Sequence, residues 1–321
     1  MRQSQDQNLR APGPFFIVMN AGSGDKDADQ REGAVRAVLT AGGRSFRLWR
    51  VTDIRRLPEV AREAVRLARQ QQGTVVAAGG DGTINAVVQE VLPSGCPFGV
   101  LPQGTFNYFS RAHGIPVDTK EASALLLNGV LRPVQVGLVN QRPFLVNASL
   151  GLYPKLLERR EVHKQRFGRH RLVALLSGFA TLLAPPPQLV LALDDGGGSD
   201  VMHICTLVVD NNPLQLRQVG LPEERALQHG ELAAIAVKAR GAGQLISALA
   251  LAALGKLGEA EGVEAFAFKR LTVNPLRPSR RIKVATDGEA KWMEPPLVFQ
   301  AAPESLLLLV PPFAPMGDGG A

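Results

Sequence analysis

Residues 74–83 read TVVAAGGDGT, an apolar run of β-branched and small residues that ends in glycines around one aspartate. A short apolar run bounded by turn residues is typical of a strand buried on both faces, as in a parallel sheet. The same pattern occurs at FFIVMN (15–20), which leads into Ala-Gly-Ser-Gly, and at FGVL (98–101), which leads into PQGTFN. Helical patterns and one more strand alternate with these runs, at 31–41, 45–51, 58–72 and 84–91. We therefore expect an α/β domain with a parallel sheet over about the first 135 residues.

The pattern changes after Arg132, where short strand-like runs are separated by Gly, Pro, Asp or Asn clusters. This pattern of short strands favours a second, mostly antiparallel domain of sandwich or barrel type. The predicted strands are 134–139, 142–148, 188–193, 201–209, 232–237, 266–273 and 281–286, with helical insertions near 155–183 and 242–258. The predicted division is a disordered N-terminus (1–12), the α/β domain (13–135), the β-rich domain (136–302), a return strand (303–313) and a disordered tail (314–321).

Composition limits the classes of protein that the chain fits. A hydrophobic fraction of 45% is ordinary for a globular protein, and two cysteines with five scattered histidines predict neither a disulfide framework nor a zinc site. We expect no secretory signal and no membrane-spanning helix, and we expect a cytoplasmic protein. The net charge of +7 favours an anionic partner. Only 5% of the residues are aromatic, so stacking on nucleic acid bases is the least favoured explanation, and we expect no nucleic-acid partner.

Three polar turns follow three of the predicted parallel strands, at 21–24, 79–83 and 103–105. The carboxyl ends of parallel strands share one edge of a sheet, and glycines let backbone amides approach a phosphate there. Thr83 and Thr105 either cap the helices that follow or donate hydroxyls to phosphate oxygens. Neither a Walker loop nor a dinucleotide fingerprint is present. Asp81 has three interpretations: it binds Mg²⁺, it orders the amides of the loop, or it is a helix N-cap.

The motifs GGDGTIN (79–85) and LPQGTFNYFSR (101–111) together resemble the diacylglycerol kinase catalytic domain family, which includes bacterial lipid kinases and sphingosine kinases. The stretch VNASLGLYPKLL (146–157) and the late Asp-Gly-Glu at 287–289 resemble further motifs of that family. The likeness extends from about residue 13 to residue 313. It implies a two-domain lipid kinase that uses ATP and Mg²⁺, with a nucleotide in the cleft between an ATP-binding domain and a β-rich lipid domain.

The resemblance also implies roles for individual residues. Glu289, or Asp287 beside it, would be the general base that takes the proton from the lipid hydroxyl. Asp81 would hold Mg²⁺, with Glu231 as a second candidate ligand. The implied nucleotide contacts are Asn20 and Thr52; Gly79, Gly80, Asp81, Gly82, Thr83, Ile84 and Asn85; and Gly104, Thr105 and Asn107.

The sequence departs from the family pattern at four places. Ala21 replaces the usual proline of the first turn, Ala86 stands where a glutamate often follows GGDGTxN, and Tyr108 stands where many relatives have aspartate. The stretch 227–232 (LQHGEL) carries His229 where relatives have an aspartate that contributes to a structural magnesium site. Imidazole is a poor Mg²⁺ ligand because that ion prefers oxygen, so the structural metal site is in question.

A basic segment at 159–171 (RREVHKQRFGRHR) leads directly into the apolar LVALLSGFATLLAPPP. Such a pair predicts either a peripheral anchor on an anionic membrane surface or a core helix with solvated arginines. QLISALALAALGKL (244–257) is a second candidate for this role. We expect a lipid substrate and action at the inner face of the cell membrane, and a homodimer stays open. The alternatives are an NAD kinase-like phosphotransferase and a nucleotide-binding membrane protein without turnover.

Overall fold

The computed structural model describes residues 10–22, 25–152, 154, 186, 188–276 and 280–312. The chain divides into two compact units, of which the first comprises 1–134 and 303–321 and the second 135–302. The first unit is α/β and the second is built from antiparallel sheets, so the predicted fold class is confirmed. The predicted segment 159–183 lies outside the described residues.

The first unit contains one sheet with the strand order β2-β1-β3-β4-β18-β5. Strands β1 (Phe15–Asn20), β2 (Phe46–Val51), β3 (Thr74–Gly79) and β4 (Phe98–Pro102) are parallel to one another. The chain leaves this unit after β5 (Val130–Val134) and returns as β18 (Leu306–Val310), which pairs in parallel with β4 and antiparallel with β5. The unit is therefore made from both ends of the chain.

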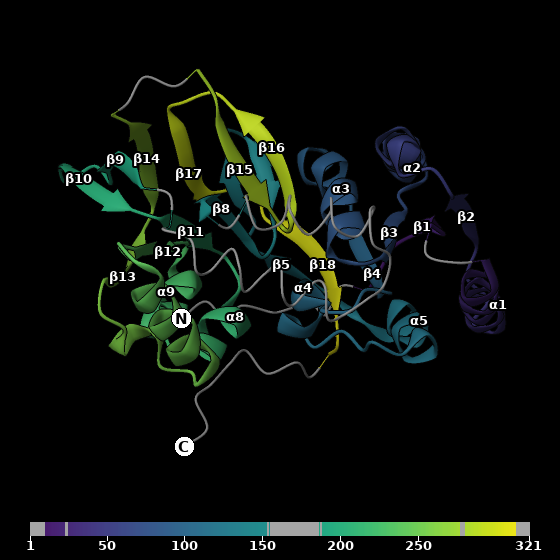
Figure 1. Ribbon diagram of the computed structural model, residues 1–321. Coiled ribbons are helices and arrows are strands. Elements are labelled where there is room, and N and C mark those ends of the chain that lie inside the picture. Colours follow the sequence, from purple (N-terminus) through teal and green to yellow (C-terminus); the bar gives the residue numbers. More distant parts are fainter. Residues whose placement is uncertain are drawn as a thin grey trace, which may run out of the picture. The chain divides into compact units, whose positions relative to one another are not determined.

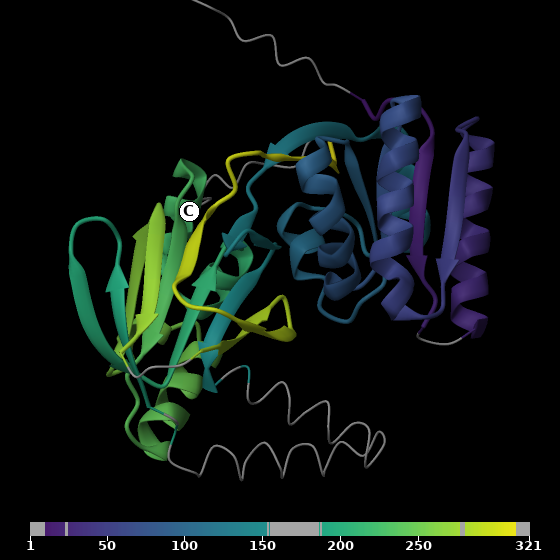
Figure 2. The ribbon, with the colours of Figure 1, turned by 90° about the horizontal axis from the view of Figure 1, so that it is seen from above.

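Helices cover both faces of this sheet (Figure 1). On one face α1 (Asp25–Ala41) and α5 (Thr119–Asn128) pack their Val35, Leu39 and Leu126 side chains against buried strand residues. The other face carries α2 (Leu57–Gln71) and α3 (Asp81–Val91). Figure 2 shows α1, in purple, running alongside β1 and β2. The short elements η1 (Ile54–Arg56), η2 (Leu92–Ser94) and α4 (Tyr108–Ala112) complete the unit.

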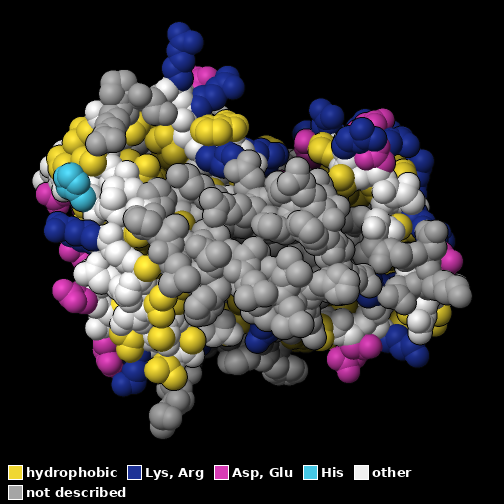
Figure 3. Space-filling model, viewed as in Figure 1, with side chains coloured by type: hydrophobic (Ala, Val, Ile, Leu, Met, Phe, Trp, Pro, Cys, Tyr) yellow, Lys and Arg dark blue, Asp and Glu magenta, His cyan; other side chains and the backbone are white. Residues whose placement is uncertain are grey.

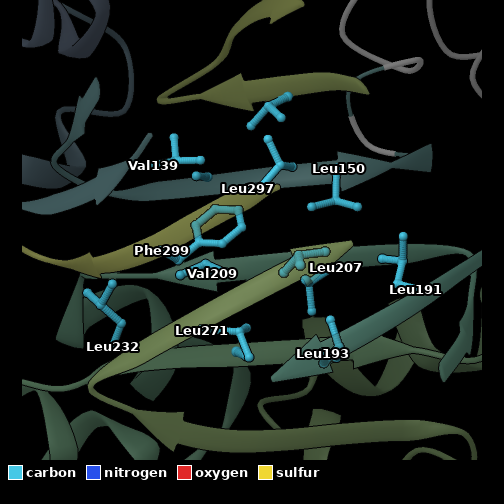
Figure 4. Packing of buried hydrophobic residues seen from close by; sticks show 14 of the residues in the cluster. Val139, Leu150, Leu191, Leu193, Leu207, Val209, Leu232, Leu271, Leu297 and Phe299 are labelled. Atoms are coloured by element: carbon cyan, nitrogen blue, oxygen red, sulfur yellow. The ribbon is translucent and has the colours of Figure 1, made fainter. Parts of the chain in front are cut away.

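The second unit is a sandwich of two sheets with the orders β10-β9-β14-β17-β6-β7 and β13-β12-β11-β8-β15-β16. The first sheet consists of β6 (Gly137–Val139), β7 (Arg142–Phe144), β9 (Leu189–Asp194), β10 (Ser199–Ile204), β14 (Arg270–Pro275) and β17 (Leu297–Ala301). The second sheet consists of β8 (Asn147–Gly151), β11 (Thr206–Asp210), β12 (Leu232–Val237), β13 (Val263–Phe268), β15 (Ile282–Thr286) and β16 (Glu289–Met293). Side chains from both sheets, among them Leu207, Leu297 and Phe299, form one core (Figure 4).

Helices pack on the second sheet at the surface away from that core. They are α8 (Pro213–Val219), η3 (Pro222–His229), α9 (Ala242–Ala253) and η4 (Leu257–Glu259). Leu216 of α8 and Leu221 pack against Ala233 and Ile235 of β12, and Leu245 of α9 packs against Val237. The strand pattern of β12 is buried throughout because both of its faces are covered.

Three strands that were predicted in this unit are each two strands in the structure, so these predictions were wrong. Residues 201–209 divide at Cys205 into β10 and β11, and residues 266–273 divide at Lys269 into β13 and β14, with the two parts in different sheets. Residues 142–148 likewise divide into β7 and β8. A bend lets a strand pass from one sheet of a sandwich to the other. Strands β16 and β17 were not predicted.

Leu297→Ala tests the sandwich core. Leu297 is fully buried, so the substitution should lower the free energy of unfolding by about 2–5 kcal/mol. Leu254→Ala is the matched control, because Leu254 is 72% exposed and its loss should change stability by less than about 0.5 kcal/mol. Urea denaturation followed by circular dichroism gives both values, and equal losses would contradict this core.

Candidate functional site

Two glycine turns of the first unit meet at the carboxyl ends of β3 and β4. The amide of Gln103 donates to the carbonyl of Gly79 over 2.8 Å. A Cβ atom placed on Gly104 would lie 2.8 Å from the Cα of Gly80, so no larger side chain fits between the turns. The GGDGT and QGT motifs, separate in the sequence, therefore form one continuous loop surface rich in backbone amides.

Asp81 connects these turns to α4. Its carboxylate oxygens accept hydrogen bonds from the backbone amides of Tyr108 (3.4 Å) and Phe109 (3.3 Å). Burial raises the pKa of Asp81, and the backbone amides of Phe109, Tyr108 and Asn107 oppose this rise. Asp81 thus acts as an amide acceptor for α4, a helix that begins 27 residues later, while it also stands first in its own helix α3.

The first turn is tied to α3 by a side-chain hydrogen bond. Asn20 Nδ2 donates to Thr83 Oγ1 over 2.9 Å, and Asn20 Oδ1 accepts from the amide of Gly22. Thr52 is exposed in the bend after β2. Ser23 and Gly24 of this turn lie outside the described residues. The structure therefore brings Asn20 and Thr83, two of the predicted residues, into direct contact.

The remaining predicted residues of this unit differ in exposure. Ile84 is fully buried, so only its backbone is available to a ligand. Asn85 is also buried, and its Oδ1 accepts from Gln89. Asn107 adopts a left-handed conformation and holds the third turn through two hydrogen bonds with the backbone of Gly104. Gly80 and Gly82 are partly exposed, whereas Thr105 is exposed.

A cavity of about 780 Å³ lies beside the third turn, entirely within the first unit. Its lining includes two arginines, Arg31 of α1 and Arg111 of α4. Gln103 also lines it, and the Nε2 of this residue is buried without a hydrogen-bond partner among the described residues. Phe106 is half exposed at the cavity, with its ring stacked on Tyr108 at a centroid distance of 5.7 Å. The cavity therefore offers cations, an unpaired donor and an aromatic face.

In the second unit, Asp287 and Gly288 form the two-residue turn between β15 and β16. Both residues have positive φ angles, as this tight hairpin turn requires. The Asp287 carboxylate accepts from the amides of Leu145, Val146 and Asn147 at 2.7, 2.8 and 3.1 Å. These bonds attach the hairpin to the loop between β7 and β8. The carboxylate of Asp287 is therefore engaged in holding the backbone.

Glu289, the other predicted general base, is the first residue of the edge strand β16. Its carboxylate is 47% exposed and lies 3.8 Å from Arg142 Nη2 and 3.9 Å from Lys291 Nζ. In the described part of the chain, Glu289 makes only these two long ion pairs, whereas the Asp287 carboxylate accepts three backbone hydrogen bonds. Glu289 is therefore the more accessible of the two predicted bases.

The sequence and the fold of this chain are similar to those of known proteins. Residues 14–139 match the family model described as the diacylglycerol kinase catalytic domain. A diacylglycerol kinase of Bacillus subtilis is 42% identical over 96 residues, and one of Staphylococcus saprophyticus is 36% identical over 91 residues. The matched segments cover 29% and 28% of this chain.

This chain is similar to the diacylglycerol kinase catalytic domain family over residues 14–139. This chain spans only about a third of the curated relatives that it matches, with 32% and 30% of their lengths aligned. A solved structure from Bacillus anthracis, of a protein proposed to be a diacylglycerol kinase, covers 94% of this chain and 98% of its own, with a TM-score of 0.72 and 16% identity. At that identity the likeness shows the shared fold of both units.

Asp210 is a buried acid of the second unit that sequence reasoning missed. It ends β11, is 1% exposed, and accepts from the amide of Asn212 over 2.7 Å. Burial raises the pKa of Asp210 well above its usual value, and the charge of Asp287 raises it further, while two backbone amides oppose the shift. Arg142 was missed as well: burial lowers its pKa, and the carboxylates of Glu289 and Asp287 oppose that change. Both residues lie in ordinary strand sequence, and no motif marks them.

The predicted metal ligands lie in different units, Asp81 in the first and Glu231 in the second. Among the described residues, no three His, Cys, Asp or Glu side chains gather closely enough to hold a metal ion by themselves. The carbonyl of Glu231 accepts from Gln135, and His229 contacts the carbonyl of Arg225 at 3.1 Å. Neither contact involves the Glu231 carboxylate, so the role of Glu231 as a metal ligand stays a prediction, while the imidazole of His229 offers no oxygen to Mg²⁺.

Asp81→Ala and Asp81→Asn test the role of Asp81 in the first unit. Alanine leaves the Tyr108 and Phe109 amides without their acceptor, so unfolding free energy should fall by about 1–2 kcal/mol. Asparagine keeps one oxygen acceptor and should cost less than half as much. Thermal denaturation of the three proteins provides the comparison, and an alanine variant as stable as the parent would contradict the role of Asp81 as the acceptor for α4.

Asp210→Asn tests the buried acid. Because the folded-state pKa is raised, the folded protein retains a proton that the unfolded chain releases above about pH 3.9, so stability falls as pH rises from there towards the folded pKa. Asparagine keeps the oxygen that accepts from Asn212 and does not titrate. The variant should therefore gain thermal stability over the parent progressively as pH rises above about 4. A pH-independent difference between Asp210→Asn and the parent would refute the prediction.

Proposed function

We propose that the protein is an ATP-dependent lipid kinase that transfers a phosphoryl group to the hydroxyl of diacylglycerol or a similar lipid alcohol. The observation that carries the proposal is the match of residues 14–139 to the diacylglycerol kinase catalytic domain, since that segment contains the glycine turns at 79–85 and 103–107. The named relatives are diacylglycerol kinases. The β-rich unit contributes the carboxylate that this chemistry needs.

The phosphate donor is assigned to the first unit. The joined GGDGT and QGT turns present backbone amides, and Arg31 and Arg111 supply positive charge in the neighbouring cavity. Amides and cations of this kind stabilise the charge of a transferring phosphoryl group. The buried Nε2 of Gln103, which has no partner among the described residues, is consistent with a ligand that accepts its hydrogen bond.

The general base is assigned to Glu289. Its carboxylate accepts the proton of the lipid hydroxyl while that oxygen forms its bond to phosphorus, and the donor leaves as a diphosphate. Asp287 holds the hairpin through three backbone amides, so it positions Glu289 and does not take the proton itself. Arg142 and Lys291 orient the Glu289 carboxylate through their ion pairs.

Mg²⁺ would bind to this protein together with the nucleotide. Mg²⁺ commonly binds through one or two carboxylates plus substrate phosphates, and it neutralises phosphate charge when bound. Asp81 fits the role of a single carboxylate beside the phosphate turns, although its oxygens also accept from Tyr108 and Phe109. The second predicted ligand, Glu231, is not carried forward into the proposal.

We further propose that the protein acts as a peripheral protein at the cytoplasmic face of a membrane. Across the described residues, no helix is both long and apolar enough to span a bilayer. Helix α9 and its end carry exposed apolar side chains, Ile246 at 39%, Leu249 at 48% and Leu254 at 72%. An amphipathic contact of this kind supports reversible binding to lipid. The basic segment 159–183 is a second candidate, from sequence alone.

Glu289→Gln tests the proposed chemistry. With ATP, Mg²⁺ and a panel of lipid alcohols in mixed vesicles, the parent should phosphorylate at least one acceptor, read by product mass. The variant should bind ATP as the parent does, and its turnover should fall by about 10²–10⁴-fold, the range for loss of a general base.

The chain supplies a matched control in Glu264→Gln. Glu264 lies on β13, the opposite edge strand of the same sheet, is 48% exposed and pairs with Lys238. Its replacement should leave turnover unchanged. NAD is included as an acceptor to test the NAD kinase-like alternative. If NAD is phosphorylated and no lipid is, the lipid-kinase proposal is wrong. The proposal is also wrong if the protein binds ATP but phosphorylates no acceptor.

A further inference from the structure

A second cavity, of about 490 Å³, lies in the second unit at the edge of the sandwich. It is lined by β6 and the following loop (Val139, Asn140), by Arg142 of the edge strand β7, and by residues of β15 and β16 and their flanks (Arg281, Lys291, Trp292, Met293, Glu294). Strands β7 and β16 are edge strands of different sheets. Asn140 links the two sides, since its Nδ2 donates to the carbonyl of Glu294 over 3.0 Å.

Positive charge predominates in this cavity. Arg142, Arg281 and Lys291 line it, whereas Glu294 is the one acidic residue of its lining. Glu294 pairs with Arg281 at 3.5 Å, and Glu289, just outside the lining, lies 3.8 and 3.9 Å from Arg142 and Lys291. Burial lowers the pKa of Lys291, and the charge of Arg142 lowers it further. Three cations thus line a small cavity whose lining contains one carboxylate.

Arg142 supplies the most specific observation. Its side chain is 19% exposed, and its Nη2 is inaccessible to solvent and without a hydrogen-bond partner in the described part of the chain. Nε of the same guanidinium makes only a long contact, 3.4 Å, to Thr286 Oγ1. A buried guanidinium donor without an acceptor is costly, and a small shift of the Arg142 side chain towards an oxyanion in the cavity would satisfy it with a charge-assisted hydrogen bond.

Trp292 stands at the rim of the cavity and is 61% exposed. Lys283 lies over its ring, with Nζ 4.8 Å from the centroid. Figure 3 shows hydrophobic side chains bordered by Lys and Arg at the upper edge of the second unit, where Figure 1 places β16. A tryptophan next to cations is an arrangement suited to the interface between lipid headgroups and acyl chains.

We infer that this cavity is a binding site for a phosphate-type oxyanion, held by Arg142, Arg281 and Lys291 with Trp292 at its rim. The guanidinium groups match two phosphate oxygens in geometry, and Lys291 adds a compact charge. The same chemistry is offered by free phosphate and by the phosphate of an anionic lipid headgroup. The inference stands on these residues and does not require the proposed kinase activity.

Fluorescence of Trp292 provides the test. The chain has two tryptophans, so Trp49→Phe leaves Trp292 as the single emitter of the full-length protein. This protein is titrated at constant ionic strength with inorganic phosphate, and separately with phosphatidylcholine vesicles that contain or lack 20 mol% phosphatidate. A saturable change of Trp292 emission is expected with phosphate, with phosphatidate vesicles, or with both.

Arg281→Gln and Lys291→Gln are the deciding variants, because their side chains are 63% and 49% exposed and their loss should leave folding intact. Each should weaken the apparent affinity about tenfold, the loss expected for one charge-assisted hydrogen bond, and Lys291→Arg should restore it. Arg142→Gln should weaken it further if that variant folds. Lys238→Gln is the control, since Lys238 pairs with Glu264 at the opposite edge of the same sheet.

The outcomes distinguish a soluble phosphate ligand, a lipid headgroup and the absence of a binding site. Binding of inorganic phosphate with no preference for phosphatidate vesicles supports a soluble phosphate ligand, and a preference for phosphatidate supports a lipid headgroup. No saturable response in either titration overturns the inference. So does an equal loss of affinity in Lys238→Gln and Lys291→Gln, because that result means attraction by general positive charge rather than by this cavity.

Discussion

Each candidate site depends on an aspartate whose carboxylate accepts hydrogen bonds from backbone amides of another segment. Asp81 holds the amides of Tyr108 and Phe109, and Asp287 holds three amides at residues 145–147. In both cases the aspartate stands in a glycine turn, where the main chain can bend closely enough to present it. A carboxylate that accepts two or three amide hydrogen bonds fixes the segments that donate them, so it positions the accessible groups of each site.

This arrangement separates motif residues that maintain geometry from those available for chemistry. Asp-Gly-Glu supplies one of each, because Asp287 is held by the backbone while Glu289 remains exposed beside Arg142 and Lys291. The GGDGT turn behaves similarly: Thr83 is bonded to Asn20 and Ile84 is in the core, which leaves the partly exposed Gly80 and Gly82 available to a ligand. The motif residues that take part in chemistry can therefore be identified only after the residues whose side chains hold the loop in place have been excluded.

The parts of the structure that were predictable from sequence are those determined by local pattern. Apolar runs ending in glycine turns predicted β1, β3 and β4 correctly, because a parallel strand buried on both faces has a distinct composition. The bends at Cys205 and Lys269 were not predicted, since sheet membership depends on partners far along the chain. For the same reason no local signal indicated that Asp287 would bond to residues about 140 positions earlier, or that Arg142 would lie beside Glu289.

The charged residues of β16 have an alternative explanation in the protection of an exposed sheet edge. Edge strands often carry charged side chains that discourage pairing with another chain, and Glu289 and Lys291 fit that purpose. Arg142 does not fit it, because a protective charge belongs in water, and this guanidinium is largely buried with its pKa lowered by that burial. A cation kept in an unfavourable environment is better explained by a ligand that it binds than by solubility. The burial of Arg142, rather than the number of charges around it, therefore distinguishes a binding cavity from an ordinary charged edge.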